Sequence, residues 1–169
     1  LGDVYKRQSF YWHFKSRAAL LDAVLVYWEE ETQWLIDEAS KAAAPTAQLL
    51  RLFSLIGEMA DQSGGNLIDS AIFRWAGQDE NVAQVVHRVE ERRISYVQHL
   101  LEAAGLPLEV ATARAELMYL AFLGYTERSG RVHTYRSAEV FERFGRLLIH
   151  VLLDDLSEDQ RHHWTRSVG

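Results

Sequence analysis

The chain lacks cysteine altogether, and its 169 residues contain no long hydrophobic run. Without cysteine there is no disulfide framework, no zinc site built from thiolates and no cysteine nucleophile. The longest apolar run, residues 117–125, is far too short to cross a lipid bilayer. These absences agree with a cytoplasmic protein that has no membrane partner, which is our expectation.

Apolar residues make up 48% of the chain, which is enough for the core of one domain and argues against disorder. The formal net charge of −6 is unevenly spread, because residues 1–17 carry a net +3 and residues 18–169 a net −9. A basic, aromatic segment on an acidic body suggests that one end meets a polyanion. A chance cluster of charges in a short window is an equal alternative.

Apolar residues recur three and four positions apart throughout, with no alternating strand pattern and no internal repeat, so we predict an all-α fold. Ser16, Asp79 and Ser137 are typical N-caps, and Gly105 is a typical helix stop. We expect the Glu29–Glu31 run to be solvated surface and residues 130–136 to form a loop. The predicted helices cover residues 16–40, 46–63, 66–77, 80–104, 108–128 and 137–155.

Residues 117–125 are apolar all round, so their helix must be covered on more than one side. A second copy of the chain is the simplest way to bury this helix. The helix at 137–155 would join it, so that two helices from each chain form a four-helix interface about a twofold axis. Burial of a central helix within the monomer is the alternative. The predicted interface residues are Leu117, Leu120, Gly124, Phe141, Phe144, Leu148 and Val151.

The stretch "SFYWHFKSRAALLDAV", residues 9–24, places five bulky residues directly before Lys15-Ser16-Arg17. It resembles the end of the helix-turn-helix in the tetracycline-repressor (TetR) family of bacterial regulators. In that family an aromatic–Tyr–x–His–Phe run ends the recognition helix, and a short basic step leads into a long connecting helix. The later stretch "GLPLEVATARAELMYLAFLGY" resembles the family's penultimate helix more loosely.

The resemblance implies that the opening segment contacts DNA. Hydroxyl, indole and imidazole groups in this run can donate hydrogen bonds to phosphates, which sets register without reading sequence. Phe10 and Phe14 would face the core of the small domain. Taken singly, each residue also suits an ordinary amphipathic helix. The predicted DNA-contacting residues are Lys6, Arg7, Ser9, Tyr11, Trp12, His13, Lys15 and Arg17.

Members of the family have two helices before the recognition helix, whereas only eight residues precede Ser9 here. A helix-turn-helix needs its first helix to brace the recognition helix on the DNA backbone. We therefore expect residues 1–17 to be the remnant of a helix-turn-helix and this chain to bind DNA poorly. We expect "LGDVYKRQ" to be the edge of a truncated or misassembled reading frame, and a natural short variant is the alternative. Residues 18–169 would form the helical ligand-binding and dimerisation domain.

The function implied by the resemblance is that of a ligand-responsive transcriptional regulator, most simply a repressor. It would bind operator DNA as a homodimer and be released by a small-molecule effector that changes the spacing of the recognition helices. Taken singly, each pocket residue is more simply plain core, and Arg93 is more simply part of a surface ion pair with Glu90 or another acidic neighbour. The candidates for lining the pocket are Phe53, Met59, Phe73, Trp75, Arg93, Tyr96, Met118 and Phe122.

Two other functions stay open. One is a dimeric, helical small-molecule-binding module that does not touch DNA. The other is an enzyme, but no Glu stands three residues before a His, as di-metal helical bundles require. Only Asp159 and His162 have that spacing, and no Gly-rich phosphate loop or nucleophile motif occurs. We predict no catalytic residue, no metal site and no cofactor.

Overall fold

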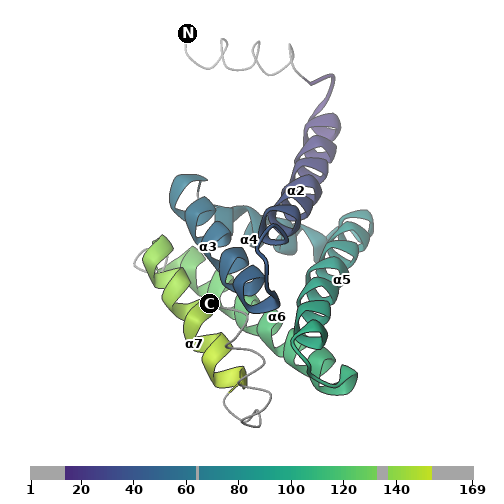
Figure 1. The fold of residues 1–169 in the computed structure, drawn as a ribbon. Coiled ribbons are helices and arrows are strands. Elements are labelled where there is room, and N and C mark those ends of the chain that lie inside the picture. Colours follow the sequence, from purple (N-terminus) through teal and green to yellow (C-terminus); the bar gives the residue numbers. More distant parts are fainter. Residues whose placement is uncertain (1–13, 64, 133–136, 154–169) are drawn as a thin grey trace.

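The computed structural model describes residues 14–63, 65–132 and 137–153, with side chains described except at 61–67 and 152–153. All regular structure in these ranges is helical, which confirms the all-α prediction (Figure 1). The predicted helix-turn-helix remnant lies mostly at 1–13, outside the described residues. The helices are α2 (Arg17–Ala39), α3 (Pro45–Ser63), α4 (Gly65–Ala76), α5 (Glu80–Ala103), α6 (Leu108–Arg131) and α7 (Ala138–Leu153).

The predicted N-caps are confirmed, because each cap side chain accepts a hydrogen bond from a backbone N–H of the first turn. The Ser16 hydroxyl accepts from the N–H of Ala19 at 3.1 Å. The Asp79 carboxylate accepts from two N–H groups of α5, and the Ser137 hydroxyl accepts from the N–H of Val140 at 3.3 Å. The sequence therefore sets where these three helices begin.

The end of α5 is also as predicted. Gly105 has φ of 98°, a conformation that side chains disfavour. The N–H of Leu106 donates to the carbonyl of Leu101, and the N–H of Gly105 donates to that of Glu102, so two carbonyls of the last turn are satisfied. This arrangement turns the chain sharply into α6.

Helix α6 is longer than predicted, because it continues through Gly130 to Arg131 where we expected a loop. Its last turn is held by packing that the local sequence does not reveal. Ser129 is fully buried, and the site of a Cβ on Gly130 would lie 3.7 Å from the Ser70 hydroxyl of α4. Contact with α4 thus extends the helix past its glycine.

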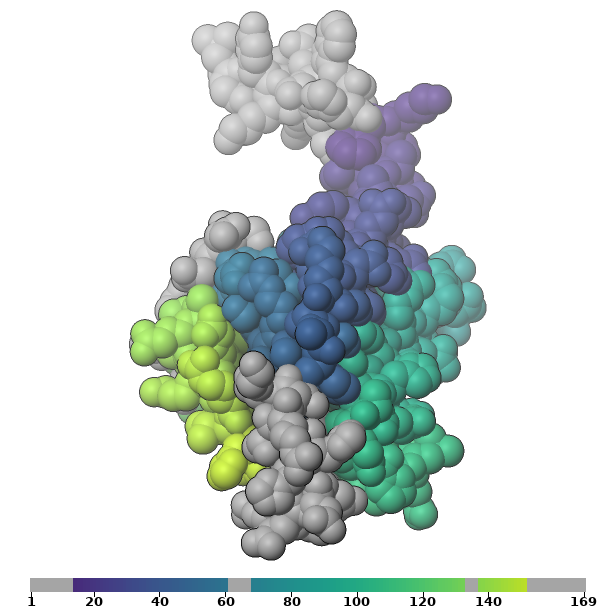
Figure 2. Space-filling model, in the orientation of Figure 1, coloured from purple at the N-terminus to yellow at the C-terminus, as the bar shows by residue number. Residues whose placement is uncertain are grey.

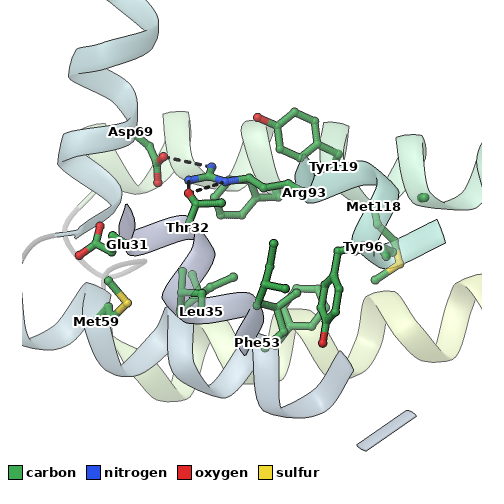
Figure 3. A pocket seen from close by; sticks show the side chains of 16 residues that line it. Glu31, Thr32, Leu35, Phe53, Met59, Asp69, Arg93, Tyr96, Met118 and Tyr119 are labelled. Atoms are coloured by element: carbon green, nitrogen blue, oxygen red, sulfur yellow. Dashed lines mark hydrogen bonds and ion pairs between the residues drawn. The ribbon is translucent and has the colours of Figure 1, made fainter. Parts of the chain in front are cut away.

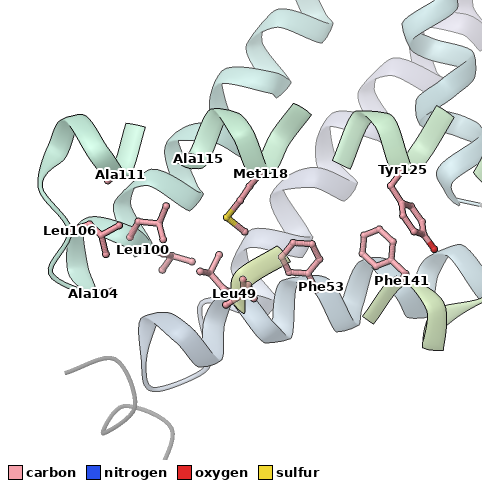
Figure 4. Close-up of a cluster of buried hydrophobic side chains, with 12 residues drawn as sticks. Leu49, Phe53, Leu100, Ala104, Leu106, Ala111, Ala115, Met118, Tyr125 and Phe141 are labelled. Carbon is pink, nitrogen blue, oxygen red and sulfur yellow. The ribbon is translucent and has the colours of Figure 1, made fainter. Parts of the chain in front are cut away.

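The larger of two hydrophobic clusters joins α3, α5, α6 and α7 (Figure 4). Phe141 lies at its centre with no exposed surface, 4.9 Å from Tyr125 and 5.8 Å from Phe53 between ring centroids. Phe141 is therefore a core residue of its own chain and has no surface to offer to the interface at which we had placed it. The smaller cluster joins α2, α4 and α5 around Trp28 and Val89.

Helix α2 has two distinct parts. Its N-terminal turns stand clear of the other helices, with residues 15–18 exposed (Figures 1 and 2). From Leu25 onward the helix enters the body and buries Leu25, Trp28 and Thr32. Of the glutamates in its middle only Glu30 is exposed, while Glu29 and Glu31 are half-buried, which corrects the expectation of a solvated run.

Large apolar side chains are exposed on both α6 and α7. Leu117 and Leu120 of α6 are 51% and 62% exposed, and Leu147 and Val151 of α7 are 58% and 68% exposed. Of the other residues assigned to an interface, Gly124 is exposed, while Phe144 and Leu148 are half-buried. Among the described helices, none is both long and apolar enough to span a bilayer.

Candidate ligand-binding cavity

A partly open cavity of about 90 Å³ lies in the body and is lined by five helices (Figure 3). Helices α2, α3, α5 and α6 supply most of the wall, and α4 contributes Asp69. Most of the lining is apolar, and the charged groups come from α2, α4 and α5. The lining residues are Glu31, Thr32, Leu35, Ile36, Leu52, Phe53, Ile56, Met59, Asp69, Arg93, Tyr96, Val97, Ala115, Met118, Tyr119 and Phe122.

The guanidinium of Arg93 organises the polar end. Its Nη1 donates to Asp69 Oδ1 at 3.1 Å, while its Nε and Nη2 donate to Thr32 Oγ1 at 3.3 and 2.9 Å. The Arg93 and Asp69 side chains are only 17% and 12% exposed. Arg93 therefore pairs with an acidic residue, as one alternative foresaw, but it does so inside the protein and not at the surface.

Aromatic rings flank the same guanidinium. The Arg93 Cζ lies 5.0 Å from the centroid of Trp28 and 5.7 Å from that of Phe122, within range of cation–π attraction. The Trp28 indole also donates from Nε1 to Asp69 Oδ1 at 2.7 Å. Arg93 is thus fixed by an ion pair, by hydrogen bonds and by cation–π contacts.

Glu31 is the second carboxylate of the cavity. Its Oε1 accepts a hydrogen bond from the Tyr27 hydroxyl at 3.0 Å. Burial raises the pKa of Glu31 above its ordinary value, and the charge of Asp69 raises it further. The Tyr27 hydrogen bond and the charge of Arg93 lower that pKa in part. In the folded protein, nearby hydrogen bonds and positive charge therefore do not fully replace the water that the ionised Glu31 carboxylate has lost.

Two tyrosines complete the polar lining. The Tyr119 hydroxyl donates to Glu90 Oε1 at 3.2 Å, and the Ser40 hydroxyl lies 3.2 Å from that of Tyr96. Burial raises the pKa of both tyrosines, so both hydroxyls stay protonated at neutral pH.

A second hollow lies between α4, α5 and α6, with a volume of about 350 Å³. Phe73 and Glu90 line it, as does Thr126, whose buried hydroxyl has no hydrogen-bond partner in the part of the chain that the structure describes. The Tyr119–Glu90 hydrogen bond joins a residue of the central cavity to one of this hollow.

Six of the eight residues predicted to line a pocket do line the central cavity: Phe53, Met59, Arg93, Tyr96, Met118 and Phe122. Phe73 and Trp75 do not, because both side chains pack against the smaller hydrophobic cluster. Phe73 stacks edge-on against Trp28, with centroids 6.0 Å apart. Whether the six bind a ligand stays a prediction.

Sequence reasoning missed Glu31, Thr32 and Asp69, and it placed none of its candidate lining residues on α2. The signal was helical phase. Glu31 stands three residues after the core residue Trp28 and four before Leu35, and Asp69 stands three before the buried Ile72. Polar residues in phase with core residues were candidates for a buried polar site.

Of the predicted DNA-contacting residues, only Lys15 and Arg17 fall within the described structure, and both are exposed. Among the described residues, no three His, Asp or Glu side chains lie close enough together to hold a metal ion. The chain matches no protein-family model, no curated protein and no solved structure.

Proposed function

We propose that the protein is a ligand-responsive transcriptional regulator of the TetR kind, in which the central cavity binds a small-molecule effector. The observation that carries this proposal is the dual position of α2. One part of the helix supplies Glu31, Thr32, Leu35 and Ile36 to the cavity wall, while its other end carries the exposed Lys15–Arg17 step.

The geometry supports coupling between ligand and DNA. From Arg17 to Thr32, α2 spans roughly 22 Å at 1.5 Å per residue. A tilt of about five degrees at the cavity would therefore move the N-terminal end by about 2 Å, given that length. A dimer that binds two half-sites one DNA turn apart tolerates little change in the distance between its two recognition helices. Ligand and DNA would then favour different positions of α2.

The dimer in this proposal uses the exposed apolar side chains of α6 and α7, which include Leu117, Leu120, Leu147 and Val151. Burial of such side chains against a second copy stabilises by about 25 cal/mol for each Å² of apolar area removed from water. The interface would then fix the two chains, and with them their two α2 helices, in one relative position.

DNA binding is tested by the salt dependence of affinity for a duplex taken from upstream of the coding sequence. We expect weak, salt-sensitive binding by the 169-residue chain. Replacing Lys15 and Arg17 together by Ala should reduce the slope of log K against log salt by about 2, because each phosphate contact contributes about 0.9. Replacing the exposed Arg143 and Arg146 of α7 is the matched control and should leave the slope unchanged.

An unchanged slope in the Lys15/Arg17 variant would favour the alternative, a dimeric binding module that does not touch DNA. Tight, sequence-specific binding by the unmodified chain would contradict our expectation that it binds DNA poorly.

Coupling is tested by a distance measurement between two spin labels. The chain has no cysteine, so Ala18→Cys on α2 and His87→Cys on α5 give two unique labelling sites, both exposed. As model ligands we use three small one-ring compounds: benzylammonium, benzyl alcohol and benzoate. We expect the one that binds most tightly, added at a saturating concentration, to shift the distance between the labels. A distance distribution that stays the same with ligand bound would contradict the lever role of α2.

A further inference from the structure

The charged groups in the cavity wall are two carboxylates and one guanidinium, Glu31, Asp69 and Arg93. The guanidinium is already engaged, because its Nε, Nη1 and Nη2 all donate within the protein. It also lies over two aromatic rings. Arg93 is therefore poorly placed to receive an anionic ligand, and with all three groups ionised the wall carries one uncompensated negative charge.

That charge resides on Glu31. Among the described residues, its one hydrogen bond comes from Tyr27, a largely exposed side chain of the same helix. Asp69 is better satisfied, since Trp28 and Arg93 both donate to it. Figure 3 shows the Glu31 carboxylate at the same end of the cavity as Asp69 and near the apolar Met59.

We propose that the cavity binds an apolar ligand with a protonated amine as its head group, and that Glu31 is the counter-ion. The inference rests on the proposed function, because it names the ligand class of that same cavity. An ammonium at this point would supply the positive charge that Glu31 lacks and donate hydrogen bonds to a carboxylate, the stronger kind of hydrogen bond. Leu35, Phe53 and Met59 would contact the apolar part.

The size of the cavity limits the ligand. Its volume of about 90 Å³ is well below the roughly 300 Å³ at which drug-sized pockets begin. The ligand is therefore an amine with a single ring or a short chain. Met59 and Met118 in the wall are flexible side chains that can adapt to its outline.

The test compares benzylammonium, benzyl alcohol and benzoate, which share one ring and differ in charge. Binding to the full chain is followed by the nuclear magnetic resonance signal of the Trp28 indole N–H, which lies beside Arg93 and Asp69. We expect benzylammonium to bind about 10- to 100-fold more tightly than benzyl alcohol, as for a hydrogen bond between charged groups. Benzoate should bind most weakly.

Glu31→Gln should abolish the preference for the cation, because the amide keeps the shape and the Tyr27 hydrogen bond but removes the charge. Glu30→Gln is the matched control, since it removes the same charge from the exposed neighbouring residue and should leave the preference intact. Lowering the pH from 7 to 4 should weaken benzylammonium and not benzyl alcohol. The groups facing Glu31 that set this titration are Tyr27, Asp69 and Arg93.

Two results would overturn the inference while leaving ligand binding in place: equal or tighter binding of benzyl alcohol or benzoate, or a cation preference that survives Glu31→Gln. Failure of all three compounds to bind would overturn the inference and also count against the cavity as an effector site.

Discussion

Arg93 Nη1 of α5 lies 3.1 Å from Asp69 Oδ1 of α4, in a pair that is largely withdrawn from water. The Trp28 indole of α2 donates to the same carboxylate oxygen at 2.7 Å. Three helices therefore meet at one carboxylate, and this junction forms the polar end of the cavity. Its energetics are the first quantity to measure.

We expect Asp69→Ala to lower the free energy of unfolding by about 3–5 kcal/mol, because it leaves a buried guanidinium without its counter-charge. Asp69→Asn keeps an oxygen for the Trp28 and Arg93 donors and should cost about 1–2 kcal/mol. Urea unfolding at a fixed protein concentration measures both. Equal costs for the two variants would mean that the charge of Asp69 contributes nothing.

Glu31→Gln should stabilise the protein without ligand at neutral pH. The pKa of Glu31 is raised in the folded state, so the folded protein holds its proton more tightly than the unfolded chain does. In the wild type, ionised Glu31 destabilises the folded state. This destabilisation is absent below the ordinary pKa of 4.5 and grows as the pH rises from there through the raised pKa. We expect Tm to rise by about 1–3 °C at pH 7 and not at pH 4.

Thermal unfolding of the variant and the wild type across pH 4–8 checks this prediction. If the increase in Tm caused by Glu31→Gln were largest at low pH, the prediction would be wrong, because a carboxyl with a raised pKa destabilises the folded state only when it is ionised.

Gly145→Ala should destabilise the protein by about 1–3 kcal/mol through overpacking between α7 and α3. A Cβ on Gly145 would overlap the Phe53 ring at Cγ and lie 2.8 Å from Phe53 Cβ, so the whole residue would have to move. Gly124→Ala is the comparison in α6: although Gly124 belongs to the predicted dimer interface, no atom of its own chain lies within 4 Å of its Cβ site. It should stabilise the chain by about 0.5–1 kcal/mol through helix propensity.

Opposite signs for these two glycines in urea unfolding are the expected outcome. A neutral Gly145→Ala would show that α7 can withdraw from α3 without loss.

The exposed apolar side chains of α6 and α7 predict a homodimer. Replacing Leu120 and Leu147 together by Glu should convert it to a monomer, because each would place a charge in an apolar interface. Val26→Glu on α2, at a residue 54% exposed, is the control and should leave the dimer intact. Analytical ultracentrifugation at micromolar concentration reads the outcome. A wild-type chain that sediments as a monomer would refute the predicted interface.

Much of the helical framework follows from local signals. Ser16, Asp79, Ser137 and Gly105 mark helix ends through hydrogen bonds that reach at most five residues along the chain. Six of the eight predicted lining residues face the central cavity because helical phase turns them inward. Phe73 and Trp75 pack on a different cluster, and periodicity within α4 does not say which cluster its apolar residues join.

The sequence by itself determined the all-α class and most of the helix ends, since both depend on neighbours within one or two turns. Only the tertiary structure decided that Arg93 pairs with Asp69, 24 residues away, and with Thr32, 61 residues away. It also decided that Phe141 is core and that Glu31 faces the cavity. Such outcomes depend on which helices pack together, and periodicity within one helix carries no information about the identity of its neighbour.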